Sequence, residues 1–94
     1  NQMDPSRETL KAVFLLKLLR VALQWPQVKM AQELGLSQSS LARLERLEAN
    51  ISLNILTKII KLSKANGIEC DIFSEDDFTI SFPNSVLEDQ WKPE

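Results

Sequence analysis

The sequence predicts a mainly α fold of four to five short helices, followed by a short C-terminal β-strand or hairpin that pairs across a dimer. Three observations support this prediction. Apolar residues recur at helical spacing through residues 10 to 63, capping residues divide them into short segments, and the spacing becomes alternating after residue 67. Ninety-four residues are enough for one small domain with one modest core.

The first helix is expected to begin at Asp4-Pro5, because Asp supplies an N-cap oxygen and Pro suits the first helical position. Apolar positions 10, 14, 18, 21 and 25 follow helical spacing. Further leucines widen the apolar arc beyond one face: Leu15, Leu16, Leu19 and Leu23. So wide an arc leaves two interpretations open, burial on two sides or a central helix within a single core.

Three shorter helices are expected next. The second covers residues 28 to 34 and ends at Gly35. Ser37 is expected to cap the third and Ser52 the fourth, which ends at Asn66-Gly67. The residues expected to point inward from these two helices are Leu41, Leu44, Leu47, Leu53, Leu56, Ile59, Ile60 and Ser63.

Alternating apolar and polar residues predict two strands within residues 68 to 82, separated by a polar turn at 74 to 77. A lone hairpin is marginal in water, and we expect one chain to leave its apolar face uncovered. Pairing with a second copy would bury that face. The residues expected at this dimer interface are Ile68, Cys70, Ile72, Phe78 and Ile80. Residues 83 to 94 are acidic and are expected to form a flexible tail.

The composition excludes several classes of site. The sequence has no His and a single cysteine, Cys70, which rules out a zinc finger, a Cys–His nucleophile pair and an internal disulfide. It has no Tyr and only two glycines, too few for a Gly-rich phosphate loop. The acidic run at residues 75 to 77 lacks the further ligands of a calcium loop. We therefore expect no enzyme activity, no cofactor and no metal.

No membrane partner is expected. The longest apolar stretch, residues 12 to 23, contains two basic residues and is too short to span a bilayer. A lone thiol fits the reducing cytoplasm, where the chain would act at the nucleoid.

The charges are divided along the chain. Residues 1 to 64 hold ten Lys and Arg against five Asp and Glu, whereas residues 65 to 94 hold one against eight. A basic body with an acidic end is typical of chains that meet a polyanion through one part only. A solvated tail that aids solubility is the alternative.

Residues 26 to 47 have the layout of a helix-turn-helix unit, a short helix, a turn containing Gly and another short helix. Leucines would hold the third helix to the core, and its other face offers residues that contact DNA. Gln pairs with adenine, Arg pairs with guanine, and Ser bonds base edges or phosphate. Glu45 and Glu48 are expected to turn away from that face. Its outward residues are Gln38, Ser39, Ala42, Arg43 and Arg46.

This stretch resembles the Cro/repressor-like (XRE) helix-turn-helix family. The matching residues are Trp25-Pro26-Gln27, Met30-Ala31, Leu34-Gly35-Leu36-Ser37, Ser39, Leu41 and Arg43-Leu44-Glu45. The resemblance implies a repressor-like helix-turn-helix DNA-binding domain over residues 4 to 67, a dimerisation segment at 68 to 82 and a tail at 83 to 94. Leu47 stands where the family often has Gly or Asn.

The resemblance also implies roles for individual residues. Gln27 is expected to contact a phosphate, while Gln38, Ser39 and Arg43 are expected to contact bases. Arg20 and Glu45 stand where many members hold a buried ion pair between the first and third helices. The full DNA-binding set is Gln27, Ser37, Gln38, Ser39, Ser40, Ala42, Arg43 and Arg46.

A four-helix unit followed by a strand and an acidic tail is similar to the HipB-type antitoxins, which are dimeric repressors of their own operon. This similarity implies three partners: a palindromic operator, a second copy of the chain and a HipA-like kinase toxin. Trp91 is the candidate toxin contact, because aromatic residues dominate such contacts. Two alternatives remain, a free-standing XRE-family regulator and a protein-interaction module that does not bind DNA.

Overall fold

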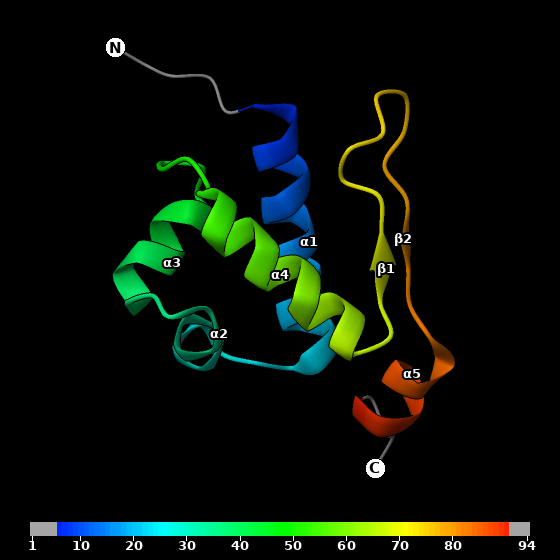
Figure 1. Ribbon diagram of the computed structural model, residues 1–94. Coiled ribbons are helices and arrows are strands. Elements are labelled where there is room, and N and C mark those ends of the chain that lie inside the picture. Colours follow the sequence, from blue (N-terminus) through cyan, green and yellow to red (C-terminus); the bar gives the residue numbers. More distant parts are fainter. Residues whose placement is uncertain (1–5, 91–94) are drawn as a thin grey trace.

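The computed structural model describes residues 6 to 90 and confirms the mainly α prediction (Figure 1). Within these residues there are five helices and one antiparallel two-stranded hairpin. The elements are α1 (Arg7–Leu23), α2 (Gln27–Leu34), α3 (Gln38–Glu45), α4 (Leu53–Ala65), β1 (Glu69–Cys70), β2 (Ile80–Ser81) and α5 (Asn84–Gln90). No helix among them is long and apolar enough to cross a membrane.

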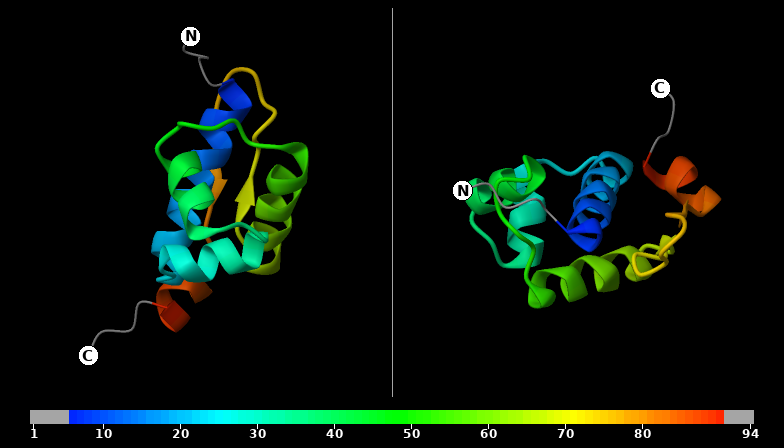
Figure 2. Two further views of the ribbon diagram at one scale, coloured as in Figure 1. Left: turned by 90° about the vertical axis from the view of Figure 1, so that its left-hand side faces the viewer. Right: turned by 90° about the horizontal axis from the view of Figure 1, so that it is seen from above.

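Helix α1 begins at Arg7, with Ser6 as its N-cap: the Ser6 hydroxyl accepts a hydrogen bond from the Thr9 backbone N–H at 3.1 Å. The expected start at Asp4-Pro5 lies outside the described residues. The helix then runs through the middle of the domain, with α2 and α3 on one side, α4 on a second side and α5 on a third (Figure 2).

The wide apolar arc of α1 faces two environments. Its central leucines, Leu15, Leu16 and Leu19, are fully buried in the core that α2, α3 and α4 complete. A second apolar row stays open, because Phe14 and Val21 keep 57% and 58% of their surface exposed. The single-core interpretation therefore accounts for only part of the arc.

Helices α1 and α2 both end on a residue with positive φ, at Gln24 (56°) and Gly35 (71°). In each case the next residue donates its backbone N–H to the carbonyl five positions earlier: Trp25 to Arg20 at 2.9 Å and Leu36 to Ala31 at 2.8 Å. This arrangement is the Schellman motif, in which two backbone hydrogen bonds satisfy carbonyls that the helix leaves unpaired. Gly is the residue that best adopts the positive φ at its C-cap. Gly35 confirms the predicted end of α2.

Gln24→Gly should stabilise the domain by about 0.5–1 kcal/mol. A non-glycine residue at positive φ costs roughly 1–2 kcal/mol, and the greater freedom of Gly in the unfolded chain offsets part of that gain. Gln24 is exposed and its side chain makes no hydrogen bond within residues 6 to 90. Urea denaturation of Gln24→Gly and Gln24→Ala measures the effect. An equal gain for Ala would contradict the backbone explanation.

Two of the expected inward leucines are exposed. Leu53 is 77% exposed at the first residue of α4, and Ile55, which the sequence pattern did not mark, is buried instead. Leu47 lies beyond the end of α3, at φ 60°, and is 40% exposed. The chain turns there in the conformation that Gly or Asn adopts more easily, and this turn removes Leu47 from the helical row.

The hairpin closes within one chain. Glu69 pairs with Ser81 and Cys70 with Ile80, antiparallel. Ile68 and Ile72 are 0% and 2% exposed in the core of their own chain, so the expectation that one chain cannot cover these residues is wrong. Two basic residues of α1 hold the turn between the strands. Lys11 donates to the carbonyls of Ser74 and Asp77, and Arg7 donates to that of Glu75.

The chain after the hairpin is not a loose tail through residue 90. Residues 84 to 90 form α5, which packs on α1 and buries Val86 to 7% exposure. The Pro83 carbonyl accepts the Val86 backbone N–H at 3.1 Å as the helix begins. The flexible-tail prediction is therefore wrong for these residues. It failed because Val86 and Leu87 are too few to show a helical period. Trp91 lies outside the described residues.

Candidate nucleic-acid interface

Helix α3 is fixed to the domain by one face and is open on the other. Leu41 and Leu44 are buried, while Gln38, Ser39 and Arg43 are exposed. Figure 1 places α3 at the left edge of the molecule, with the core to its right. The open face therefore points away from every other element, as a helix that enters a DNA groove requires.

Some of the predicted DNA-binding residues are engaged in capping α3 or are less accessible than Gln38 and Arg43. The Ser37 hydroxyl caps α3, accepting the Ser40 backbone N–H at 3.1 Å, and it also bonds the hydroxyls of Ser40 at 2.8 Å and Ser39 at 3.2 Å. Ser40 and Ala42 are half-buried. Ser37 and Ser40 thus serve first to fix the start of the helix, and Ser39 is the exposed hydroxyl beside Gln38.

Arg46 differs from the prediction for the outward face. Its guanidinium makes two hydrogen bonds to the Glu48 carboxylate, at 3.0 and 3.1 Å. These bonds raise the pKa of Arg46 and lower the pKa of Glu48. The expectation that Glu48 turns away from this face is wrong. The chain leaves α3 at Arg46 and bends at Leu47, which brings Glu48 back beside Arg46.

Glu48→Gln should tighten binding to duplex DNA several-fold at low salt, whatever the sequence of the duplex. The substitution removes a carboxylate that would repel phosphate and frees Arg46 to contact it. Affinity measured on one specific and one scrambled duplex, each over a salt series, checks this. Glu33→Gln, on α2 and unpaired within residues 6 to 90, is the matched control. A gain confined to the specific duplex would contradict a phosphate role for Arg46.

An ion pair joins the end of α1 to the end of α3. Arg20 Nε lies 2.7 Å from Glu45 Oε2, and Arg20 Nη2 lies 3.0 Å from Glu45 Oε1. The Glu45 side chain is only 7% exposed and that of Arg20 is 26% exposed. Arg20 Nη1 also donates to the Trp25 carbonyl at 3.2 Å. The pair implied by the family resemblance is thus present and two-pronged, the stronger geometry for such a pair.

The same carboxylate positions the first residue of α2. Gln27 Nε2 donates to Glu45 Oε1 at 2.8 Å. An amide nitrogen carries two hydrogens, so Gln27 keeps one N–H for the phosphate contact expected of it. Pro26 precedes it as an N-cap without a side-chain hydrogen bond. The hydrogen bond to Glu45, rather than a capping side chain at Pro26, therefore orients the Gln27 side chain.

A small groove beside Arg43 adds residues that the sequence analysis missed. Its volume is about 180 Å³, and it lies between α3 and the start of α4. Besides Arg43, its polar lining comes from Ser40, Asn50 and Ser52. Asn50 and Ser52 belong to the linker after α3, where no sequence period applies. They are further candidates for phosphate contacts next to α3.

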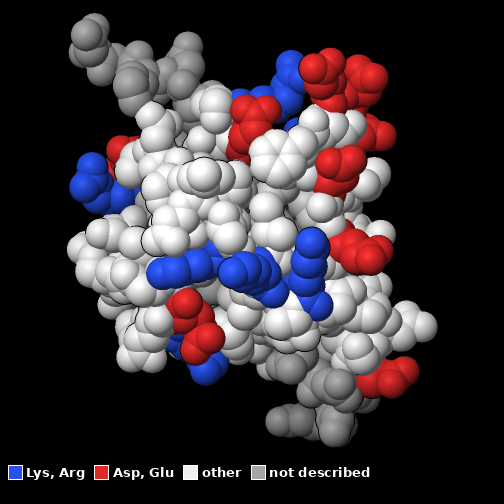
Figure 3. Space-filling view, in the orientation of Figure 1, with Lys and Arg blue, Asp and Glu red and all other residues white. Residues whose placement is uncertain are grey.

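The acidic residues of the hairpin lie far from α3. Figure 3 shows acidic side chains gathered around the hairpin, on the opposite side from α3. The turn carries Glu75, Asp76 and Asp77. A row of basic side chains crosses the face formed by α4, whose lysines are Lys58, Lys61 and Lys64 (Figure 3). The acidic part of the chain would therefore not lie along a duplex bound at α3.

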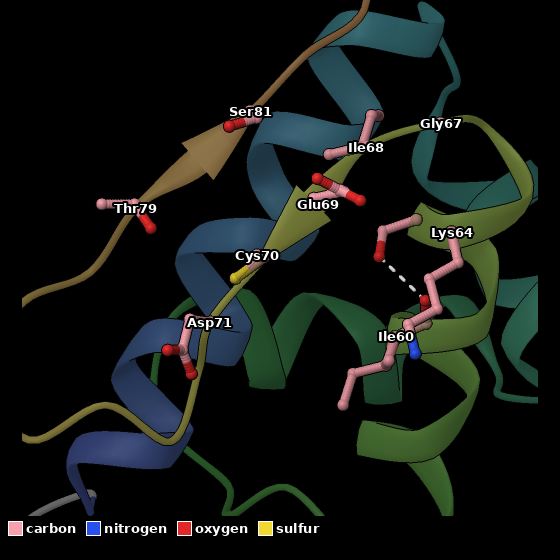
Figure 4. A pocket seen from close by; sticks show the side chains of 10 residues that line it. Ile60, Lys64, Gly67, Ile68, Glu69, Cys70, Asp71, Thr79 and Ser81 are labelled. Atoms are coloured by element: carbon pink, nitrogen blue, oxygen red, sulfur yellow. Dashed lines mark hydrogen bonds between the residues drawn. The ribbon is translucent and has the colours of Figure 1, made fainter.

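A pocket of about 560 Å³ lies between α4 and the hairpin, away from α3 (Figure 4). Lys64 lines it from α4, and Glu69, Cys70 and Asp71 line it from β1 and the residue after it. Burial, and then the charge of Asp71, raise the pKa of the Cys70 thiol, which keeps it in its unreactive form. Residues 6 to 90 contain no group of His, Cys, Asp and Glu side chains that could hold a metal ion.

The comparison with known families bears on this geometry. A helix-turn-helix family model of the XRE type matches residues 16 to 72, more than half of the chain. The chain belongs to this helix-turn-helix family. The match runs from the middle of α1 through α2, α3, α4 and β1 to residue 72. No curated protein and no solved structure gives a significant match.

Membership of the XRE-type family makes the chain a DNA-binding transcription regulator that contacts double-stranded DNA. The family is not typically enzymatic. The matched segment contains α3 and its anchoring residues Leu41, Leu44 and Glu45, and the α1–α5 contact lies partly outside it.

Proposed function

We propose that this XRE-type regulator is a sequence-specific repressor that binds a palindromic operator as a homodimer. The observation that carries the proposal is the exposed row of Gln38, Ser39 and Arg43 on a helix whose other face is anchored. Among the described residues, no acidic side chain pairs with Arg43. Gln and Arg are the side chains best suited to two-pronged contacts with adenine and guanine.

The homodimer follows from the size of the reading face. One short helix contacts only a few base pairs, which is too little to select one operator among many sites. Two copies related by a twofold axis read two half-sites about 34 Å apart on the same side of the duplex. A repressor of this kind acts by occupying the operator, at the nucleoid in the cytoplasm.

The proposal includes an antitoxin role of the HipB type, in which a HipA-like kinase toxin is the protein partner. Its support is the position of the acidic hairpin. The hairpin lies on the side of the molecule away from α3 (Figure 1), so a partner bound there would leave DNA reading free. Trp91 remains the proposed toxin contact.

Selection of bound duplexes from a random pool tests the repressor proposal. We expect enrichment of an inverted repeat whose half-site centres are 10 to 11 base pairs apart, and loss of enrichment for Gln38→Ala/Arg43→Ala. Binding that is equal for all duplexes and disappears with salt would overturn it and favour the protein-interaction module.

The antitoxin role has its own test, which does not depend on the operator. The gene beside this one is expected to encode a kinase-like protein, and the two purified proteins are expected to coelute in gel filtration. Absence of a complex at micromolar concentrations would leave a free-standing XRE regulator.

A further inference from the structure

One side of α1 is not covered by any described element. Seen from above in Figure 2, α2 and α3 flank α1 on one side, α4 covers a second and the hairpin with α5 a third. The exposed apolar residues of α1 occupy the remaining side. Leu10 is 44% exposed, Phe14 57% and Val21 58%, and their spacing places them along one ridge with Leu18.

The ridge continues onto the chain that follows β2. A shallow groove of about 280 Å³ is lined by Leu18 and Val21 of α1 together with Phe82, Val86 and Leu87. Phe82 is 40% exposed and Leu87 is 63% exposed. We define the α1–α5 face by its apolar residues: Leu10, Phe14, Leu18, Val21, Phe82 and Leu87. The exposed Lys17 lies among them on α1, between Phe14 and Val21.

The size of this face matches what a homodimer needs. An aromatic side chain offers roughly 150–250 Å², so Phe14 leaves about 100 Å² uncovered at its exposed fraction of 57%. The α1–α5 face as a whole then leaves on the order of 500 Å² of apolar surface. A standard interface buries about 800 Å² per partner, and about 65% of it is apolar in homodimers. The apolar part of a standard homodimer interface is therefore also about 500 Å² per partner.

We infer that a second copy of this chain covers the α1–α5 face, packed about a twofold axis. The inference deepens the proposed function and rests on it, because it says where the two halves of the repressor meet. Phe14 is the most exposed aromatic residue of this face, and its ring contacts Phe78 edge-on with 5.9 Å between centroids. Large aromatic side chains often carry much of the energy of such contacts.

The direction of α3 favours this face over the hairpin. In a twofold dimer the interface plane contains the axis, so a second copy placed on the side opposite α3 would point its own α3 the other way. The hairpin lies on that opposite side (Figure 1). The uncovered side of α1 lies across the direction from α3 to the hairpin (Figure 2). An interface there lets both copies of α3 face one duplex.

Charge leads to the same choice. The hairpin exposes Glu69, Asp71 and the acidic turn at 75 to 77, and pairing two such edges would bring like charges together. The exposed charges on and beside the α1–α5 face are of both signs: Lys17 lies among its apolar residues on α1, and Glu88 lies on α5. Two copies that meet there therefore do not bring together a run of like charges.

Sedimentation equilibrium of the full chain without DNA tests the inference. We expect the wild type to be a dimer and Val21→Glu and Leu10→Glu each to raise the dimer dissociation constant at least 30-fold. Phe73→Glu is the matched control, since Phe73 is 64% exposed on the hairpin turn and outside the α1–α5 face. Its dissociation constant should equal that of the wild type.

Binding to a half-site duplex separates this inference from the proposed function. Val21→Glu should bind one half-site with unchanged affinity, because α3 is untouched, and should lose cooperative binding to the inverted repeat. A monomeric wild type, or a dimer that Val21→Glu and Leu10→Glu leave intact, would overturn the inference, and the duplex selection would still decide the repressor role. Dissociation by Phe73→Glu alone would move the interface to the hairpin.

Discussion

Arg20→Met is expected to lower the free energy of unfolding by about 3–5 kcal/mol, because Arg20 is the charged partner of a buried carboxylate. Glu45 is 6% exposed and receives hydrogen bonds from Arg20 and Gln27. Without Arg20 the buried carboxylate keeps only the neutral amide of Gln27 as a partner. An uncompensated buried charge is the reason for a penalty of this size.

A second ion pair in the same chain supplies the matched control. Arg46 and Glu48 are joined by bonds of similar length, yet their side chains are 57% and 54% exposed. Exposed pairs contribute little because water screens them, so Arg46→Met should change the unfolding free energy far less than Arg20→Met does. Comparing the two Arg→Met variants isolates the effect of burial.

Urea denaturation of Arg20→Met, Glu45→Gln and the double variant measures the coupling between the two residues. The double variant should be more stable than Arg20→Met alone, because it carries no buried charge. Should Arg20→Met cost no more than Arg46→Met, the pair contributes nothing beyond a surface contact, and the positioning of α3 would have to be assigned to Leu41 and Leu44.

The helices were predictable from sequence because their ends carry local signals. Ser37 and Ser52 accept backbone hydrogen bonds as predicted, and Gly35 has the positive φ that ends α2. Such signals act over three or four residues, and they are read directly from the chain. The start of α1 at Ser6 was missed because another capping residue, Asp4, precedes it.

The contacts that could not be predicted from the sequence are those that depend on how the chain turns between its helices and strands. Glu48 reaches Arg46 only because Leu47 adopts a positive φ. The family pattern, which often has Gly or Asn at this position, indicates a turn there but does not show that the turn brings Glu48 beside Arg46. Ile68 and Ile72 were assigned to a dimer interface, yet they are buried in the core of their own chain. The dimer remains a prediction, but its interface had to be sought among residues that the fold leaves exposed.

The candidate site likewise contains features that the sequence predicted and one that it did not. The family pattern placed Gln38, Ser39 and Arg43, and the structure leaves all three exposed. The hydrogen bond from Gln27 to Glu45 joins residues 18 positions apart, a relation that neither spacing nor the family pattern contained. Base contacts themselves stay predictions until binding is measured.

Arg43→Ala is expected to weaken operator binding by about 1–3 kcal/mol, which is roughly 5- to 150-fold. The loss should be concentrated at one base pair in each half-site. Arg43 is exposed in the last turn of α3, and among residues 6 to 90 its guanidinium has no hydrogen bond or ion pair to break. The fold should therefore be unaffected, so that the change in affinity reports the contact with DNA alone.

Lys29→Ala is the control, because the Lys29 ammonium lies 4.7 Å from the centre of the Trp25 ring, on α2 and off the open face of α3. Affinities for a set of operators that each differ by one base pair should fall evenly, or not at all, when Lys29 is replaced. With Arg43→Ala the ranking of those operators should change, because a two-pronged contact to guanine is lost at one position. An even loss across the set would instead assign Arg43 to the phosphate backbone and leave the reading of bases to Gln38 and Ser39.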